Sequence, residues 1–386
     1  MEKVLMVTSV ASMIDQFNMP NISLLQSMGY EVHVACNFEK GSTCSAEKIE
    51  ELKKKLVEEK VRYFQIDFLR SALKLSEHKR AYKQLDKIAK ENRYIFMHCH
   101  SPIGGVIGRM VAHKYKVKVI YTAHGFHFYK GAPLKNWFLY YPIEKLCSRW
   151  TDVMITINKE DYALAKKKMY AKKVEYVPGV GMDTAKFGAG KREENRVRIR
   201  AELGIPKEAR LLLSVGELNE NKNHEIVIQA SAELSEIKAG EVYYAIVGKG
   251  ELEGKLRELI KSLKLEKQIF LLGFRNDIAA IYDAADIFVF PSKREGLSMA
   301  LMEAMARGLP CVVSRIRGNT DLLIEGKGGC FCKADDIEGF AEKIEYLLRN
   351  FPNSICYGKY NQNRIKEFDI HIVGEKMRKI YESQGE

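Results

Sequence analysis

Short apolar runs recur along the chain and are separated by longer, charged segments. The first series, rich in Val, Ile and Met, covers residues 4–7, 32–35, 63–66, 95–98, 118–122, 153–157 and 174–177. Because these runs show no polar alternation, they predict parallel strands that are covered on both faces. Between them, segments such as 46–60 and 76–92 combine helix-forming residues with charged faces, which predicts helices.

A second series of apolar runs follows, each with a helical pattern after it. It covers residues 211–215, 243–247, 269–272, 287–290, 311–314 and 329–331. Alternation of strands and helices predicts an α/β fold, and 386 residues are more than one core usually needs. We therefore expect two Rossmann-like, doubly wound domains that face one central cleft.

The domain boundary is expected near a charge-rich stretch, residues 183–198, which contains Gly188-Ala189-Gly190 and is typical of an interdomain linker. The sequence thus predicts an N-terminal domain over residues 1–185 and a C-terminal domain over residues 186–364. A final helix is expected at about residues 372–382, within the remaining segment 365–386.

Composition is that of a globular protein. Hydrophobic residues make up 46% of the chain, and no apolar stretch of 18 residues could span a bilayer. The first residues read as a strand rather than a secretion signal, so we expect a cytoplasmic protein. The cysteines are scattered without C-x-x-C pairs, which favours reduced core residues over a zinc site. They are Cys36, Cys44, Cys99, Cys147, Cys311, Cys330, Cys332 and Cys356.

The net charge of +12 indicates an anionic partner. Nucleic acid, an anionic membrane surface and anionic small substrates would each attract such a chain. No helix-turn-helix, zinc-finger or RNA-binding signature is present, so nucleic acid is not expected. A membrane surface together with phosphate-bearing substrates fits better.

The strongest functional signal is a pair of carboxylates, Glu295 and Glu303, eight residues apart. They follow the predicted strand 287–290, and a helix is expected from Ser298 onward. Eight helical residues span roughly 12 Å. Backbone N–H groups at the helix start favour a phosphate between the two carboxylates. This order fits a nucleotide-diphosphate sugar, and the alternative is two solvated surface glutamates.

Over nearly its whole length, and most strongly between Leu211 and Ile324, the chain resembles the retaining glycosyltransferases of family 4, which have the GT-B fold. Four blocks agree in order with the family: 214–218 with 222–223, 247–250, 272–274, and 290–306. In that family the first glutamate of the last block contacts the transferred sugar and the second holds the ribose hydroxyls. The resemblance assigns these roles to Glu295 and Glu303, and it implies that the C-terminal helix packs back on the first domain.

A cation is needed for the donor's pyrophosphate. Gly216 lies where a side chain would crowd a phosphate, and Lys222 is the expected counter-ion, although a solvated loop lysine is the alternative. Family members usually carry a basic residue directly after this glycine, but here it is Glu217. Arg275, Lys293 or Arg294 is therefore expected to compensate. The predicted donor-binding residues are Gly216, Lys222, Phe274, Arg275, Glu295, Gly296, Leu297, Ser298 and Glu303.

His124 ends a predicted parallel strand, at the edge where open α/β sheets bind ligands. The resemblance implies that it faces the reacting sugar; without the family, a structural role is the commoner one. The expected catalytic residues are His124, Lys222 and Glu295. His98 and His100 would share one strand face, but no closed four-ligand pattern follows, so neither a metal nor another cofactor is expected.

The acceptor should be selected by the N-terminal domain. The family's glycine pair after the first strand is missing, which makes an acceptor role for residues 15–18 plausible. The predicted acceptor residues are Asp15, Phe17, Asn18, His100 and His127. Segments 126–130 and 135–141 mix aromatic rings with lysines, as suits the headgroup layer of a membrane. Packing of a helix against its own domain explains the same residues.

The resemblance implies an enzyme that transfers a hexosyl or N-acetylhexosaminyl group, with uridine as the expected base of the donor. A polyprenyl-diphosphate-linked glycan acceptor is expected, at the inner face of the cell membrane. In the family's front-side displacement, the leaving diphosphate accepts the proton of the acceptor hydroxyl. Two alternatives stay open: a nucleotide-sugar epimerase of the same architecture, and a two-lobed sugar-binding protein without catalysis.

Overall fold

A computed structural model describes residues 1–40, 45–69, 74–100, 102–179, 181–188, 191–234 and 242–385. Cys44 and the linker residues Ala189 and Gly190 lie outside these ranges. The chain forms two compact units. Unit 1 comprises Met1–Gly181 and His371–Glu386, and unit 2 comprises Met182–Ile370. The sequence analysis places the corresponding boundary after residue 185.

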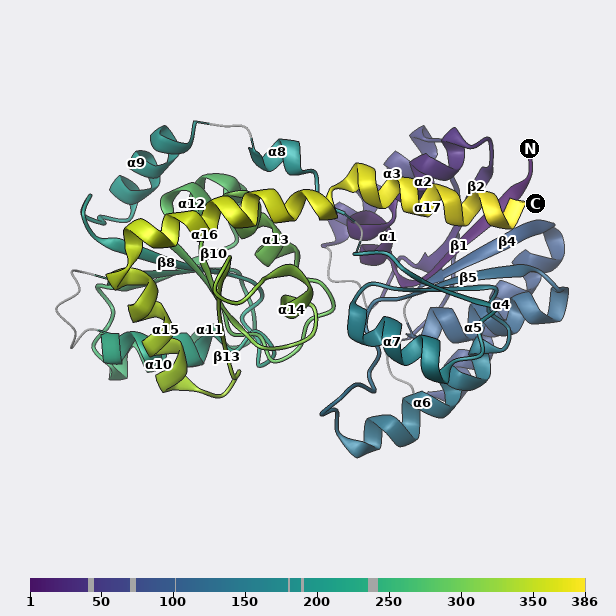
Figure 1. Ribbon diagram of the computed structural model, residues 1–386. Helices are drawn as coiled ribbons and strands as arrows, with labels where there is room; N and C mark the ends of the chain where they lie inside the picture. Colours follow the sequence, from purple (N-terminus) through teal and green to yellow (C-terminus); the bar gives the residue numbers. More distant parts are fainter. Residues whose placement is uncertain are drawn as a thin grey trace. The chain divides into compact units, whose positions relative to one another are not determined.

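Unit 1 is built on a seven-stranded parallel sheet with helices on both faces (Figure 1). The strand order is β3-β2-β1-β4-β5-β6-β7, the doubly wound order, so the chain reverses direction across the sheet between β1 and β4. Its strands are β1 Lys3–Val10, β2 Glu31–Asn37, β3 Arg62–Gln65, β4 Tyr94–His100, β5 Lys118–Ala123, β6 Val153–Thr156 and β7 Lys173–Tyr176. Its helices are α1 Ala11–Phe17, α2 Met19–Ser27, α3 Ala46–Glu58, α4 Leu75–Glu91, α5 Pro102–Tyr115, α6 Leu134–Ser148, α7 Lys159–Lys168 and α17 Ile370–Gly385.

Strand β1 shows why the apolar runs lack polar alternation. Val4 and Met6 pack into one hydrophobic core of unit 1, while Leu5 and Val7 pack into the other. Successive side chains of a strand point to opposite faces, so a strand with a core on each side must be apolar at every position.

The last helix, α17, packs on unit 1. Val373, Met377, Ile380 and Tyr381 belong to the same hydrophobic core as residues of α2 and α3, beside which α17 is drawn in yellow in Figure 1. The residues directly before α17, up to Ile370, belong to unit 2, whereas the sequence analysis ends the C-terminal domain at residue 364.

Unit 2 is built on a six-stranded parallel sheet, with strand order β10-β9-β8-β11-β12-β13. Its strands are β8 Arg210–Val215, β9 Val242–Val247, β10 Ile269–Gly273, β11 Ile287–Phe290, β12 Cys311–Ser314 and β13 Gly329–Cys332. Its helices are α8 Thr184–Gly188, α9 Arg192–Glu202, α10 His224–Leu234, α11 Glu253–Ser262, α12 Ile278–Ala284, α13 Met299–Ala306, α14 Asn319–Leu322, α15 Ile337–Arg349, α16 Phe351–Arg364 and the 3-10 helix η1 Ile365–Phe368.

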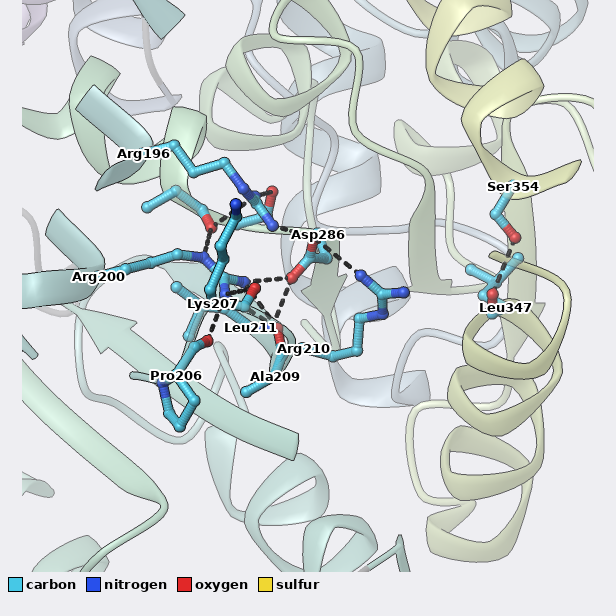
Figure 2. Close-up of polar contacts among 12 residues, drawn as sticks. Arg196, Arg200, Pro206, Lys207, Ala209, Arg210, Leu211, Asp286, Leu347 and Ser354 are labelled. Carbon is cyan, nitrogen blue, oxygen red and sulfur yellow. Dashed lines mark hydrogen bonds and ion pairs between the residues drawn. The ribbon is translucent and has the colours of Figure 1, made fainter. Parts of the chain in front are cut away.

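Helix α9 corrects the expected linker. The charge-rich stretch after residue 183 forms α8 and α9 and belongs to unit 2. Figure 2 shows the reason: Asp286, buried at the amino end of β11, accepts from Arg196 at 2.8 Å and from Arg200 at 2.6 Å. Arg210 lies 4.0 Å from the same carboxylate. The arginines therefore hold α9 on the sheet, and a charged sequence here encodes ion pairs rather than a solvated linker.

The observed strands confirm both predicted series. Of the seven cysteines within the described ranges, six are buried and unpaired, as expected, whereas Cys356 is exposed. Among the described residues, no helix is both long enough and apolar enough to cross a bilayer.

Candidate functional site

In unit 2 the candidate donor site lies where β8 and β11 meet. These adjacent strands form the switch point of the sheet, the position at which doubly wound proteins bind ligands beyond the carboxyl ends of the strands. The loop after β8 carries Gly216 and Lys222, and the segment after β11 carries Glu295 and the start of α13. Residues more than seventy positions apart in the sequence thus meet at one edge.

Lys222 and Glu295 form an ion pair. The Lys222 Nζ donates to Glu295 Oε1 at 2.7 Å, and both side chains are largely buried. The same ammonium lies 4.9 Å from the centre of the Phe290 ring, the last residue of β11. The structure therefore brings together the two residues predicted to contact the pyrophosphate and the sugar, and it contradicts neither role.

Asn223 fixes the direction of Lys222. Its backbone has a φ of 58°, a left-handed conformation that asparagine tolerates better than most residues. Its side-chain amide donates to the carbonyls of Pro291 at 3.2 Å and Ala334 at 2.7 Å. The loop after β8 is thereby tied to the segment after β11.

Two glycines allow this loop to pack closely. A Cβ on Gly248 would lie 1.9 Å from the Gly216 carbonyl oxygen, so only glycine fits there. A Cβ on Gly216 would lie 3.2 Å from the side chain of Lys222. Gly216 therefore makes room for the lysine, a reason that differs from the crowding of a phosphate that the sequence suggests.

The start of α13 offers donors to an anion. Ser298 is the N-cap, and its hydroxyl accepts from the N–H of Leu301. Within the described chain, the N–H groups of Gly296, Leu297 and Ser298 donate to no acceptor. Since α13 begins only at Met299, Glu295 lies in the preceding loop, and the helical span of roughly 12 Å does not apply between the two glutamates.

Glu303 lies on α13 and is held by a tyrosine. The Tyr282 hydroxyl is 3.0 Å from Glu303 Oε2 and 3.0 Å from the carbonyl oxygen of Ala300. Burial, together with the charge of Glu303, raises the pKa of Tyr282 well above its ordinary value, so the tyrosine stays a donor. Glu303 is half-buried.

The predicted auxiliary donor residues are not drawn into this cluster. The Arg275 guanidinium pairs with Asp277, with Nε 2.8 Å from Oδ1, and with Glu202. Two carboxylates therefore already neutralise it. The Phe274 ring is exposed, as are Lys293 and Arg294. Lys222 is the one predicted donor-site cation that the described residues place against Glu295.

In unit 1 three histidines meet at the carboxyl ends of β4 and β5. The rings of His98 and His100, on one face of β4, lie with centres 4.0 Å apart. The His100 Nδ1 is 3.1 Å from the His124 Nε2. His98 is held by Thr122 Oγ1 at 2.8 Å and by the Tyr381 hydroxyl of α17 at 2.9 Å.

These histidines are neutral at physiological pH. Burial lowers the pKa of His98 to about 3 and that of His124 to about 4, and it holds the pKa of His100 well below its ordinary value. Desolvation disfavours the imidazolium of all three, and His124 also disfavours a charge on His98 and on His100. His124 can therefore accept or donate one hydrogen bond, but it would not act as a cation.

The other predicted acceptor residues divide into two groups. Phe17 lies with its ring centre 6.1 Å from that of His124, and Asn18 helps to line a small cavity of about 20 Å³ together with His100 and His124. The Asn18 amide itself donates to the Met13 carbonyl at 2.8 Å. Asp15 lies 4.0 Å from Lys48, and His127 packs against Tyr140, so neither joins the histidine cluster.

Sequence reasoning missed a buried ion pair beside His127. Arg109, on α5, is completely buried and donates to both oxygens of Glu144 on α6, at 2.6 and 3.2 Å. Its guanidinium also lies 3.9 Å from the centre of the Tyr121 ring. The available signal was a single arginine within the otherwise apolar segment 103–112.

No cluster of three or more histidine, cysteine or acidic side chains suited to a metal ion occurs among the residues that the structure describes.

Comparison with known proteins identifies the family. A model described as "Glycosyl transferase 4-like" matches residues 3–158, and one described as "Glycosyl transferases group 1" matches residues 195–364. EpsD of Bacillus subtilis (strain 168), a protein named as a glycosyltransferase, is 34% identical over 98% of this chain and 96% of its own. The UDP-Gal:alpha-D-GlcNAc-diphosphoundecaprenol alpha-1,3-galactosyltransferase of Escherichia coli is 29% identical over 84% of each chain.

The fold agrees with solved structures. The crystal structure of Anabaena Alr3699/HepE in complex with UDP superposes with a TM-score of 0.79, at 17% identity, over 99% of this chain and 100% of the other. With two doubly wound sheets, and with relatives and family models that cover both units, the chain belongs to the glycosyltransferases of family 4 and has the GT-B fold.

Proposed function

We propose that this enzyme transfers a sugar, with retention of configuration, from a UDP-sugar to a hydroxyl of a lipid-linked glycan in polysaccharide synthesis. The Lys222–Glu295 pair carries the proposal, because it places a cation and a carboxylate beside the free N–H groups that precede α13. An anionic diphosphate and a sugar hydroxyl are the groups that such a set would bind together.

The names of the relatives support the choice of substrates. Alr3699/HepE was crystallised with UDP and with UDP-glucose, which favours uridine as the base and a hexose as the sugar. The Escherichia coli relative acts on a diphosphoundecaprenol-linked sugar, which favours a polyprenyl-diphosphate acceptor. Such an acceptor and the charge of +12 both suit an enzyme that binds the inner face of the membrane peripherally.

The proposed step is a front-side displacement. The bond between the anomeric carbon and the diphosphate oxygen breaks, and the acceptor oxygen forms its bond on the same face of the sugar. The proton of the acceptor hydroxyl passes to the departing diphosphate. Lys222 and the N–H groups of residues 296–298 would stabilise the negative charge that develops on the diphosphate. Because these groups supply the positive charge, transfer should persist in the presence of EDTA.

The remaining side chains orient the reactants. Glu295 would accept from a hydroxyl of the transferred sugar, and Glu303, held by Tyr282, from the ribose hydroxyls. His124 would serve as a neutral hydrogen-bonding group toward the sugar.

The two glutamates provide the test. Glu303→Ala should weaken UDP binding by about 1.5–3 kcal/mol, roughly 10- to 150-fold, in isothermal titration calorimetry. Glu295→Ala should leave UDP binding within a few-fold and reduce kcat instead. Glu258→Ala, on the exposed face of α11, is the matched control. If both active-site variants changed UDP affinity and turnover equally, the assignment of the two roles would be wrong.

A further inference from the structure

Unit 1 contains an apolar groove with a volume of about 470 Å³. Its walls come from α4, α5, α6 and the segment after β5, and include Ile103, Val106, Ile107, Met110, Phe126 and Ile143. This volume falls within the range of sites that bind small organic molecules. Because the lining is predominantly apolar, the groove does not suit the nucleotide, whose contacts are proposed for unit 2.

The groove continues onto an exposed apolar face of α6. Leu134 is 74% exposed and Phe138 is 80% exposed, and Leu139, Ile143 and Leu146 are also exposed. Ile143 belongs to both surfaces, and Met110 of α5 is likewise exposed at the groove. Helices of a folded domain normally bury such side chains, so the exposed apolar residues of α6 beside the groove indicate an apolar partner.

Cations surround this surface. Lys145 lies 5.6 Å from the centre of the Tyr141 ring and 5.1 Å from that of Tyr170, and Lys168 lies 5.6 Å from that of Trp137. Lys79 lines the groove itself. Ammonium groups around an apolar surface complement a ligand that has an apolar chain and an anionic head.

The groove also lies close to the candidate acceptor residues of unit 1. Its lining includes Gly125–Phe128, the residues directly after His124 at the carboxyl end of β5. A chain lying in the groove would therefore have its head group near the edge that carries His100 and His124. That is the order of groups in a lipid-linked acceptor: hydrocarbon, diphosphate, then sugar.

We propose that the groove binds the isoprenoid segment of the acceptor that adjoins its diphosphate. The proposal rests on the proposed function for its acceptor, but it assigns a separate binding site in unit 1. The bilayer would cover the exposed face of α6, while the isoprenoid segment would leave it to enter the groove beside Met110 and Ile143.

Direct binding tests the groove without any activity. In titration calorimetry, farnesyl monophosphate should bind the protein, and Met110→Glu/Ile143→Glu should weaken binding at least tenfold. Both side chains are partly exposed, so the double variant should fold. Val197→Glu/Ile355→Glu places the same two charges on exposed apolar residues of unit 2 and should change nothing. If the unmodified protein did not bind farnesyl monophosphate, or if the double variant bound it as tightly as the unmodified protein, the proposal would be overturned.

Acceptor kinetics separates the groove from the proposed function. The double variant should raise KM at least tenfold for an acceptor with a polyprenyl chain, while KM for a short-alkyl acceptor and for the UDP-sugar stays unchanged. Leu134 lies on α6 but outside the groove. Leu134→Glu should therefore weaken vesicle binding but should not raise KM for the polyprenyl acceptor relative to the short-alkyl acceptor. Equal effects on both acceptors, or a concentration-dependent dimer that the double variant abolishes in analytical ultracentrifugation, would contradict the groove. Binding of farnesyl monophosphate without transfer to any acceptor would contradict the proposed function alone.

Discussion

The two units have the same sheet order around their switch points but build opposite environments there. In unit 2 the edge carries charge: Lys222 lies against Glu295, beside N–H groups that have no acceptor among the residues the structure describes. In unit 1 the edge carries three neutral imidazoles, of which His98 and His100 are buried and His124 is half-buried, and it leads into an apolar groove. The backbone arrangement is shared, so the side chains at the strand ends determine which kind of ligand each unit can bind.

The difference matches the substrates of a glycosyltransferase. A nucleotide diphosphate requires cations and N–H donors, whereas an acceptor hydroxyl must be positioned without being charged. A neutral histidine can do this at any pH from about 5 upward, because its pKa is lowered by burial.

The Arg109–Glu144 pair is the exception in unit 1, and removing it should produce the largest effect. Arg109→Met leaves a carboxylate buried without its partner, which should cost about 3–5 kcal/mol of unfolding free energy. Both tryptophans, Trp137 and Trp150, lie in unit 1, so their fluorescence in urea reports this unit alone. Arg109→Met/Glu144→Gln should recover much of the loss. Equal stability of the single and double variants would mean that packing, not charge, explains the pair.

Lys222 tests the charged edge of unit 2. Lys222→Met should reduce kcat by about 10²–10³-fold, or roughly 3–4 kcal/mol, because the departing diphosphate loses its ammonium group. Lys261→Met, on the exposed face of α11, is the control. If kcat fell by less than tenfold, groups other than Lys222 would have to balance the charge on the diphosphate.

Acidification should destabilise unit 1 more than unit 2. Each buried histidine has a folded-state pKa below its unfolded value, so only the unfolded chain binds a proton as pH falls below about 6.5. Each such group then contributes about 1.4 kcal/mol of destabilisation per pH unit, down to its folded-state pKa. His98 and His124 lie in unit 1, with His100, whereas His224 is the buried histidine of unit 2 with a pKa lowered to about 4.

Between pH 6.5 and 5, tryptophan fluorescence in urea should therefore show a steeper loss for unit 1 than hydrogen exchange shows for β8 and β11 of unit 2. His98→Gln and His100→Gln should flatten the pH dependence of unit 1. Equal losses of stability in both units would contradict the expected difference between unit 1 and unit 2.

The smallest effect concerns the hydroxyl that links α17 to the histidines. Tyr381→Phe leaves the His98 Nδ1 without its partner and should cost about 1–3 kcal/mol of unfolding free energy in unit 1. Activity with saturating substrates should change little, because His98 is one ring removed from His124. Tyr346→Phe, on the exposed face of α15 in unit 2, is the control.

A structural feature could be predicted from the sequence when the residues that produce it lie close together in the chain. The strands were predictable because a strand with a core on each face must be apolar throughout, as Leu5 and Met6 show. Glu295 and Glu303 could be singled out because the family resemblance is carried by a continuous block, and their roles stay predictions. Arg109 and Glu144 lie on two helices and are 35 residues apart in the sequence, and no local sequence pattern indicates that they form a pair.

One expectation failed, and another stays a prediction, because ion pairs join residues far apart in the chain. The stretch after residue 183 looks like a linker, but the partner of its arginines, Asp286, lies about ninety residues later. Arg275 stays a predicted donor-binding residue, although Glu202 on α9 pairs with it. Charge composition shows that ion pairs are possible, whereas only the fold shows which carboxylate each cation finds.

The return of α17 to unit 1 has a consequence for synthesis of the protein. Tyr381, Met377 and Val373 of α17 complete a core whose members outside α17 lie between Val4 and Val177. On the ribosome, the first sheet can form early, but the part of its face that α17 covers stays exposed until the whole of unit 2 has been made. Nascent chains halted before residue 370 should therefore expose this face to chaperones, and release of the last helix should end that exposure.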